Sequence, residues 1–548
     1  MTRETVTKKE NRKGGKDPMH EAFEEYLKIF RTELPLDECF DLIERKLRIG
    51  GRQAVMYFVD GLHDGQKGQL LLDYLLAVQP ETMEGLHESK DFLETAVPFM
   101  DASVVEPGAA GTLDAAVYDC YLQTLPKLYA GLVPLIVEGL DKIIILDVRD
   151  YPSRSVEEPE KERTLRGARD GFTENMMENV AMIRRRLRSN QLIFKVFNVG
   201  TDSKSDVVLC YMQDRADLKF IEKLESSLVD MKEKALAGRC ADRKPQYDGQ
   251  NRPGKERYGQ AEAKSGGTSA EPVLAQSSAG DFDALTVTDQ SLLEHLQESF
   301  GIASSLNPFP RVRYTQRPDV AAAHLEEGKV VLITDNSPTA MMIPVSVFEF
   351  FQDTDDYYFP QLTGNYFRLL RILNFIVILL LTPTYVLMVE YEWFTPDLLR
   401  FFVPEDDYVI SIFWQFMLLE LAIDALKLAS LNTPTSLGMS LSVIGALILG
   451  EFSISSGWFI PQTILCMAVV ALASFTQPSI ELSYAMKFGR VLMLIGAQVL
   501  GLGGMIAAAA VSLLVMGTTR TLAGTSYLYP LIPFDWKVLK RLLFRVKR

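Results

Sequence analysis

The stretch ILNFIVILLLTPTYVLMV at residues 372–389 decides the fold of this chain, because it contains no charged residue. Two further uncharged stretches follow it, at 452–480 and 491–519. A helix rises 1.5 Å per residue, so about 20 apolar residues cross a hydrocarbon core about 30 Å thick. A soluble domain does not need several such runs in succession. Residues 361–517 are therefore predicted to form an α-helical polytopic membrane domain of five or six membrane segments.

The remainder of the chain has the composition of a soluble protein. The net charge of −14 over 548 residues argues against a nucleic-acid partner, whose binding surface would be basic. Five scattered cysteines without a CxxC pair are typical of reduced thiols in a cytosol: Cys39, Cys120, Cys210, Cys240 and Cys466. Residues 1–19 lack the apolar core of a signal peptide, and we expect them to be a disordered basic tail.

Residues 20–150 are predicted to form a first α/β subdomain. Apolar residues recur at three- and four-residue spacing through 20–50, which predicts helix there. Continuous β-branched or aliphatic runs predict buried strands at 54–62 and 142–148. Helices are expected between them, around 66–78, 88–98 and 113–139. This alternation indicates an α/β fold.

Residues 151–190 are predicted to be a charged connector that ends in an amphipathic helix. Met176, Val180, Ile183 and Leu187 make its apolar stripe. The simpler interpretation of the basic run 184–186 is a solvated face at the helix C-terminus, and phosphate binding is the weaker alternative.

Residues 191–360 are predicted to form a second α/β subdomain. Its first two strands, 192–199 and 206–212, should pair as a hairpin. Residues 238–280 are poor in aromatic residues and rich in Gly, Ser, Gln, Lys and Asp, so they are predicted to be a disordered insertion.

The distribution of basic residues predicts the orientation in the membrane. Arg368 and Arg371 precede the first span, and the loop 390–407 after it is acidic. Basic flanks stay cytoplasmic, so the N-terminal region should lie inside. The basic tail 518–548 should also lie inside, which requires the last apolar run to be two passes or a re-entrant hairpin bent at GLGG, 501–504. Both termini are therefore expected to be cytoplasmic.

Two groups of residues in the membrane domain are candidates for function. The first is Glu420, Asp424 and Lys427, which share one side of a helix. Ionisable groups at membrane depth are costly and normally face protein or a water-filled path. A salt-bridge cluster near a helix end explains the same spacing equally well.

The second group is a stripe of small residues, Gly438, Ser442, Ala446 and Gly450, followed by Glu451. Such a stripe allows helices to approach closely, which is its commoner meaning, or lines a narrow pore in a ring of subunits. Glu451 would then lie at the pore mouth, and the alternative for it is an interfacial position.

Several long motifs carry a family resemblance. They are RSVEEPEKERTLRGARDGFTEN (154–175), RRRLRS (184–189), RYTQRPDVAAAHLEEGKVVLITDNSP (313–338), TPTSLGMSLSVIGALILGE (433–451) and FTQPS (475–479). The chain from about 35 to 535, except the insertion, resembles the A-subunit family of spore germination receptors, the GerA type. The motif residues singled out are Glu157, Glu158, Pro159, Arg166, Gly167, Arg169, Gly171, Phe172, Arg184, Arg185, Arg186, Arg317, Pro318 and Asp319.

The resemblance implies a protein of the inner spore membrane that acts in germination. Family A subunits are expected to assemble as homo-oligomeric ion channels, by resemblance pentamers, with both termini on the spore-core side. B- and C-type receptor subunits, or a small membrane protein, are the implied partners. The alternative is a non-conducting scaffold or signalling subunit. A secondary transporter is disfavoured, since it would need paired broken helices in two repeats.

No enzymatic or cofactor-dependent function is expected from the motifs. The chain has no GxxxxGK[ST], GxSxG or HExxH sequence, and its five histidines are isolated from one another. We therefore predict no cofactor, no metal site and no catalytic residue.

Overall fold

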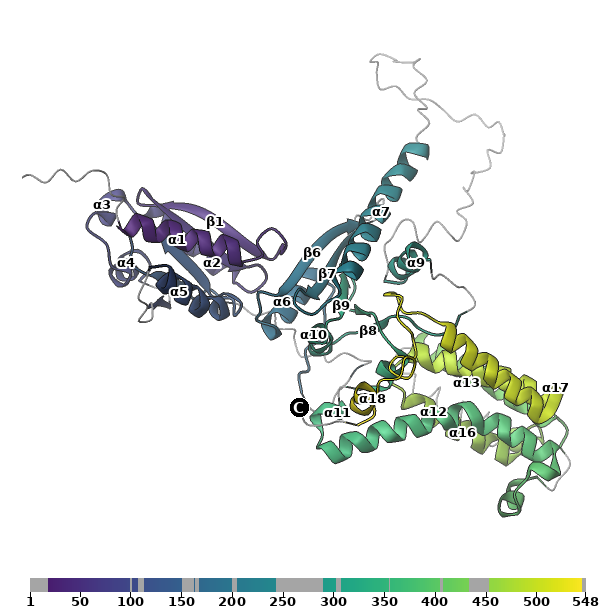
Figure 1. The fold of residues 1–548 in the computed structure, drawn as a ribbon. Coiled ribbons are helices and arrows are strands. Elements are labelled where there is room, and N and C mark those ends of the chain that lie inside the picture. Colours follow the sequence, from purple (N-terminus) through teal and green to yellow (C-terminus); the bar gives the residue numbers. More distant parts are fainter. Residues whose placement is uncertain are drawn as a thin grey trace, which may run out of the picture. The chain divides into compact units, whose positions relative to one another are not determined.

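The computed structural model describes residues 18–98, 101–106, 113–149, 162, 167–199, 205–242, 289–301, 307–353, 355–404, 408–432 and 453–544 (Figure 1). The chain divides into two compact units. The first comprises Met1–Ser153, Phe172–Ser299 and Ala322–Ala340. The second comprises Arg154–Gly171, Phe300–Ala321 and Met341–Arg548, so it contains the apolar helices together with two short segments from the polar region.

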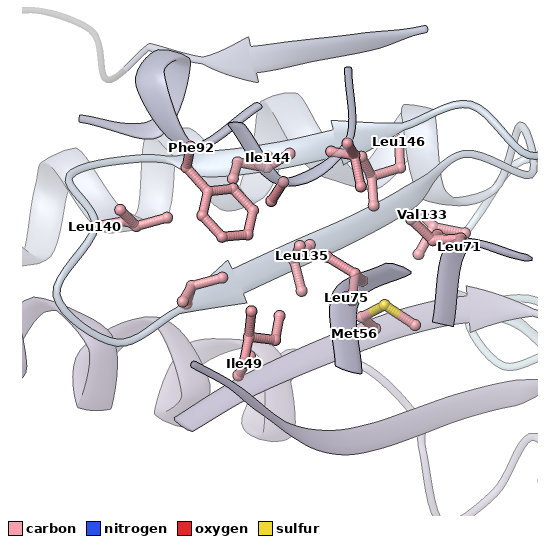
Figure 2. Close-up of a cluster of buried hydrophobic side chains, with 14 of the residues drawn as sticks. Ile49, Met56, Leu71, Leu75, Phe92, Val133, Leu135, Leu140, Ile144 and Leu146 are labelled. Atoms are coloured by element: carbon pink, nitrogen blue, oxygen red, sulfur yellow. The ribbon is translucent and has the colours of Figure 1, made fainter. Parts of the chain in front are cut away.

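The first sheet has the strand order β1-β2-β4-β5-β3, and its neighbouring strands are antiparallel. The strands are β1 (Leu42–Ile49), β2 (Arg52–Val59), β3 (Ala102–Val105), β4 (Val133–Val137) and β5 (Ile143–Leu146). The helices of this part are α1 (Pro18–Glu33), α2 (Gly65–Ala77), α3 (Pro80–Met83), α4 (Ser89–Ala96) and α5 (Leu113–Leu128). Figure 2 shows Leu71 and Leu75 of α2 and Phe92 of α4 among aliphatic side chains of the sheet, such as Leu135. This core lies within residues 20–150, for which the sequence predicts the first α/β subdomain.

In this part of the chain, two of the predicted helices are longer than the helices in the structure. The helix expected over 20–50 ends at Glu33, and β1 follows it. Gly50 and Gly51 both have positive φ, which permits the tight turn that pairs β1 with β2. The helix expected over 113–139 ends at Leu128, and β4 begins at Val133. In both places the chain is extended because it pairs with a neighbouring strand. The spacing of the apolar residues, from which helix was predicted, does not indicate this pairing.

The second sheet has the order β6-β7-β9-β10-β8. The strands are β6 (Leu192–Val199), β7 (Ser205–Met212), β8 (Arg313–Thr315), β9 (Val330–Thr334) and β10 (Ala340–Ile343). The predicted hairpin is confirmed, with Leu192 opposite Met212. The helices of this region are α6 (Met176–Arg186), α7 (Leu218–Asp242), α9 (Asp289–Ser299) and α10 (Pro318–Glu326). Because α7 continues to Asp242, the predicted insertion starts too early at Gly238, and its residues from 243 onward lie outside the described ones.

A buried ion pair lies in the first unit. Arg184 near the end of α6 donates from Nε and Nη2 to the Asp41 carboxylate, at 2.8 and 2.9 Å, and both side chains are fully buried. Its guanidinium also lies over the rings of Tyr129 and Phe194. The solvated interpretation of the run 184–186 is therefore wrong for Arg184. Arg185 is exposed, and Arg186 donates to the Met182 carbonyl at 2.9 Å.

The second unit is dominated by helices. They are α11 (Asp355–Tyr358), α12 (Gln361–Glu390), α13 (Ile412–Asn432), α15 (Ser453–Ser455), α16 (Pro461–Phe475), α17 (Ile480–Thr518) and α18 (Trp536–Leu543), with 3-10 turns η1 (Val347–Phe351), η2 (Glu392–Phe394) and η3 (Asp397–Phe402). Of the described helices, α12 and α17 are long and apolar enough to cross a membrane, and α16 is shorter. Many large apolar side chains on their surfaces are exposed, including Leu373, Leu472 and Leu514. The surface is suited to lipid or to neighbouring subunits.

Helix α17 reverses direction at Gly501. This residue has φ 62° and ψ −143°, a conformation open to glycine, and it separates arms at 480–500 and 502–518. A Cβ placed on Gly504 would overlap the carbonyl oxygen of Gly496, and a Cβ on Gly489 would lie 3.5 Å from Ser512 Oγ. These residues are placed symmetrically about the bend, so the two arms pack antiparallel. The structure has a helical hairpin at the glycines instead of one straight crossing.

The chain enters and leaves this bundle at the same end. Near the start of α12, the Asn374 amide donates to Thr476 at 2.9 Å, just after α16 ends. At the other end, Gln415 in the first turn of α13 accepts from Thr463 at 2.8 Å, near the start of α16. After α17, Arg541 returns to α12, where its carbonyl accepts from Arg368 at 3.3 Å. The first turns of α12 and the segment after α17 therefore lie close together.

The close approach within the hairpin gives the first testable prediction. Gly504→Ala should lower the stability of the bundle by about 1–3 kcal/mol, because the added methyl overlaps a backbone atom that cannot rotate away. The apparent Tm of the purified protein in detergent measures this. Gly503→Ala is the matched control, because a Cβ there meets nothing within 4 Å. Equal effects of the two substitutions would contradict the packed hairpin.

Candidate functional site

Three clusters of charged side chains lie in the second unit, and the first contains family-motif residues. We call Glu162, Gly167, Arg317, Asp319 and Tyr358 the motif cluster. Arg317 is 1% exposed and pairs with Asp319 through Nε at 3.0 Å and Nη2 at 2.6 Å. Its Nη1 donates to the Glu162 carbonyl at 3.3 Å, and Nη2 also donates to the Ala168 carbonyl at 3.1 Å. The guanidinium therefore joins the connector at 162–168 to the start of α10.

Glu162 and Tyr358 complete the motif cluster. The Glu162 carboxylate accepts from Thr315 Oγ1 and from the Gln316 amide, both at 2.8 Å. Burial raises the pKa of Glu162 above its usual value, while these hydrogen bonds act in the opposite direction. Tyr358 donates to Asp319 at 3.1 Å, and its ring covers Gly167, where φ is +111° and a side chain would overlap the ring. Glycine is required there on both grounds.

The raised pKa of Glu162 predicts a pH dependence of stability. The folded chain holds this proton to higher pH than the unfolded chain, whose glutamate titrates near 4.5. The contribution of Glu162 to the free energy of unfolding is therefore fully present below that pH, and it is lost as the pH rises through the folded pKa. Glu162→Gln should flatten this fall in pH-dependent thermal melts. Glu94→Gln, an exposed change, should leave the slope as it is, and an unaltered slope in Glu162→Gln would contradict the assignment.

The second group, the helix-start cluster, consists of Asp356, Arg368 and Arg371. Asp356 is fully buried. Arg371 Nη1 lies 2.8 and 2.7 Å from its two carboxylate oxygens, and Arg368 Nε lies 3.2 Å from Oδ2. The two arginines were predicted as flanks of the first span, but α12 begins at Gln361 and contains both. Arg368 and Arg371 can lie buried within α12 because both pair with Asp356. The pattern of charges in the sequence does not indicate this pairing.

Helix α11 connects the first two clusters. Within its four residues, Asp356 contacts α12 and Tyr358 contacts the motif cluster. The backbone of Asp356 also lies against Gly364, where a Cβ would overlap the Asp356 carbonyl oxygen. The connector, the start of α10 and the first turns of α12 are therefore held together through one short helix.

The third group, the bundle cluster, consists of Glu420 and Asp424 on α13 with Lys487 and Arg490 on α17. Arg490 Nε lies 2.7 Å from Glu420 Oε1, and both side chains are buried. Arg490 also donates to the Ile378 carbonyl on α12 at 3.1 Å. Lys487 pairs with Asp424 and lies 3.5 Å from Glu420 Oε2. Charges at this depth normally meet protein partners in this way, and here they join three helices.

The structure shows which cations form ion pairs with the two predicted acids, Glu420 and Asp424. The salt-bridge interpretation grouped Glu420 and Asp424 with Lys427, and the structure adds ion pairs of both acids with cations of α17. Lys427 lies over the rings of Phe475 and Tyr484. Lys487 and Arg490 precede the uncharged stretch 491–519, but they already lie within α17, which begins at Ile480. The serine at 479, which caps this helix by accepting from the Leu482 amide, was the available signal for the earlier start.

The other predicted residues have different outcomes. Pro318 is the first residue of α10, Arg169 is exposed, and Gly171 and Phe172 are buried. Several candidates lie outside the described residues: Gly438, Ser442, Ala446, Gly450, Glu451, Glu157, Glu158, Pro159 and Arg166. The pore stripe therefore stays a prediction.

Comparison with known proteins identifies the class. Residues 30–239 and 281–548 match the Bacillus/Clostridium GerA spore germination protein family. The chain belongs to the GerA family, and this membership supports a role in spore germination. The chain is 32% identical over 525 residues to stage V sporulation protein AF of Bacillus subtilis (strain 168), covering 96% of this chain and 92% of that protein. The sequence motifs DVRDYPSR (147–154) and RGARDGF (166–172) also resemble this relative.

Two further proteins are similar to this chain. Spore germination protein KA of Bacillus subtilis (strain 168) is 25% identical over 525 residues, covering 94% of this chain and 84% of that protein. The N-terminal domain of the A subunit of the Bacillus megaterium spore germinant receptor GerK3 is a solved structure with 18% identity and a TM-score of 0.34. That match covers 58% of this chain and 92% of the solved chain.

Proposed function

We propose that this chain is an ion-channel subunit of a spore germination complex, and that it releases cations across the inner spore membrane as a homo-oligomer. Both termini would face the spore core. The observation that carries the proposal is the path of buried charges from the motif cluster through α11 to α12 and the bundle cluster. Such a path can transmit a change in the connector to the helices that cross the membrane.

The mechanism we infer is electrostatic and mechanical. Asp356 holds α11 on α12, so a shift of the motif cluster displaces the first turns of α12. Arg490 holds the Ile378 carbonyl in the middle of the same helix, so this displacement reaches Glu420 on α13. Coupling of this kind requires an element with two alternative positions, whose equilibrium is shifted by both the motif cluster and the bundle cluster. We propose that α12 is this element.

The exposed apolar faces of α12, α16 and α17 support assembly with further copies or with other membrane subunits. B- and C-type receptor subunits, or a small membrane protein, are the proposed partners. The pore itself is assigned by the sequence to Gly438, Ser442, Ala446 and Gly450, with Glu451 at its mouth.

Ion flux through reconstituted protein tests the function. The purified full chain in liposomes should conduct cations, and Ser442→Leu or Ala446→Leu should reduce the flux several-fold without loss of the oligomer. Glu451→Gln should mainly lower the preference for cations. Glu94→Gln, at an exposed position of the first unit, is the control and should conduct normally.

The competing scaffold function gives a different pattern. A non-conducting subunit shows no flux in liposomes at any protein density, although it inserts and assembles. If Ala446→Leu breaks up the oligomer in step with the flux, the small-residue stripe packs helices and the pore lies elsewhere. Oligomer size and flux must therefore be measured on the same preparations.

A further inference from the structure

The segment 528–544, after the helical hairpin, combines exposed apolar residues with basic ones. Its exposed apolar side chains are Leu531, Ile532, Phe534, Trp536 and Phe544, each 45% exposed or more. Its basic residues are Lys537, Lys540 and Arg541, and all three are exposed. Asp535 is the one acid of the segment, and its carboxylate caps α18 by accepting from the Lys537 and Val538 amides. The exposed face therefore carries a net positive charge.

The helical spacing in α18 places the two kinds of residue side by side. Trp536 and Lys540 are four residues apart, and so are Lys537 and Arg541, so each pair lies on one face. Leu539, between them, is buried against the protein. Exposed aromatic side chains are unfavourable in water, whereas aromatic and basic residues together suit the boundary between lipid headgroups and acyl chains.

This segment is fixed at the end of the bundle where α12 begins. Arg368 in α12 donates to the carbonyls of Arg541 and Leu542 at 3.3 and 3.1 Å. The Tyr527 carbonyl, just before the segment, accepts from the Val347 amide at 3.0 Å. The basic residues therefore lie at the level where the apolar helices would emerge from the membrane.

An apolar cavity of about 200 Å³ lies between this segment and α12. Its lining includes Phe351, Ile372, Phe375, Met516, Leu531 and Leu542. Because Leu531 is 45% exposed, the cavity opens to the outside beside it. Gln352 and Arg368 also border the cavity, but the rest of its lining is apolar, which suits an acyl chain.

We propose that this segment and the first turns of α12 bind an anionic phospholipid of the adjacent leaflet. Lys537, Lys540 and Arg541 contact the phosphate, and an acyl chain enters the cavity. The negative surface of a bilayer attracts each basic residue near it, which favours anionic over zwitterionic lipid. The inference goes beyond the channel function and requires only that the helical bundle lies in a membrane.

Lipid titration of the purified full chain tests the proposal. Native mass spectrometry in detergent should detect phosphatidylglycerol binding more tightly than phosphatidylcholine. Lys537→Gln, Lys540→Gln and Arg541→Gln together should weaken phosphatidylglycerol binding about 100-fold, at about fivefold per charge, and leave phosphatidylcholine binding unchanged. The control removes three exposed lysines of the first unit, Lys46, Lys90 and Lys219, and should bind as the parent does. Equal binding of both lipids by the parent, or an equal loss in the control, overturns the proposal.

Two further measurements test whether an acyl chain enters the cavity and how deep the segment 528–544 lies in the bilayer. Leu531→Trp should fill the cavity and weaken binding of both lipids, and unchanged binding contradicts entry of an acyl chain. A spin label at Ile532→Cys, with Cys240→Ser to leave only buried native cysteines, reports the depth of the segment in nanodiscs. Phosphatidylglycerol should make the label accessible to oxygen and shield it from a water-soluble nickel chelate. If both reagents reach the label, the segment lies in water, and the site is rejected. If neither reagent reaches the label in the absence of lipid, a protein partner covers the segment, and the site is also rejected.

Discussion

Asp356→Asn is expected to give the largest loss of stability in the second unit. The substitution keeps the shape of the side chain but leaves Arg368 and Arg371, both buried, without their carboxylate. Breaking one buried ion pair typically costs about 3–5 kcal/mol, and two guanidinium groups lose a partner here. We expect a large fall in the apparent Tm and a loss of flux, because α11 no longer holds α12.

Asp353→Asn is the matched control for this prediction. Asp353 lies 3.3 Å from Arg371, but its side chain is 41% exposed. Exposed pairs contribute about 0–1 kcal/mol, so the same chemical change should have a small effect there. Comparable losses in the two variants would show that Asp356 does not have the role we assign to it.

Arg490→Gln is expected to have the second largest effect. It leaves Glu420 buried between α13 and α17 with Lys487 at 3.5 Å as its remaining cation, and it removes the contact with the Ile378 carbonyl. A loss of about 3 kcal/mol, the lower end of the range for a broken buried pair, follows because Lys487 compensates only part of the Glu420 charge. Flux measured beside thermal stability should fall, since α12 is released from the bundle cluster.

A double variant tests whether the stability lost in Arg490→Gln is caused by the charge left on Glu420. Glu420→Gln with Arg490→Gln removes both charges, and replacing a buried pair is usually much less costly than breaking it. The double variant should therefore recover most of the stability lost in Arg490→Gln. Lys427→Gln removes a charge that lies over the rings of Phe475 and Tyr484, and it should cost only about 0.5–1 kcal/mol. Additive losses in the double variant would mean that Arg490 and Glu420 do not interact.

These predictions concern residues that the sequence identified only in part. Arg317 and Asp319 were recognised as motif residues, but their contact with the connector at 162–168 depends on segments more than 140 residues away. Asp356 and Glu162 gave no signal, since a lone acid in a charged segment is usually solvated. Burial distinguishes them, and burial arises from tertiary packing.

The sequence by itself determined the layout of the chain. Uncharged runs long enough for a bilayer predicted the apolar helices, continuous aliphatic runs predicted the central strands, and the GLGG sequence marked the place where α17 reverses. Each of these follows from local chemistry, that is, from hydrophobic length, β-branching and backbone freedom at glycine. The tertiary structure alone decided which charges pair, because Arg490 with Glu420, and Arg184 with Asp41, meet across 70 and 143 residues of chain. A charged side chain has the same sequence pattern whether it faces water or a buried partner, and only folding removes the water.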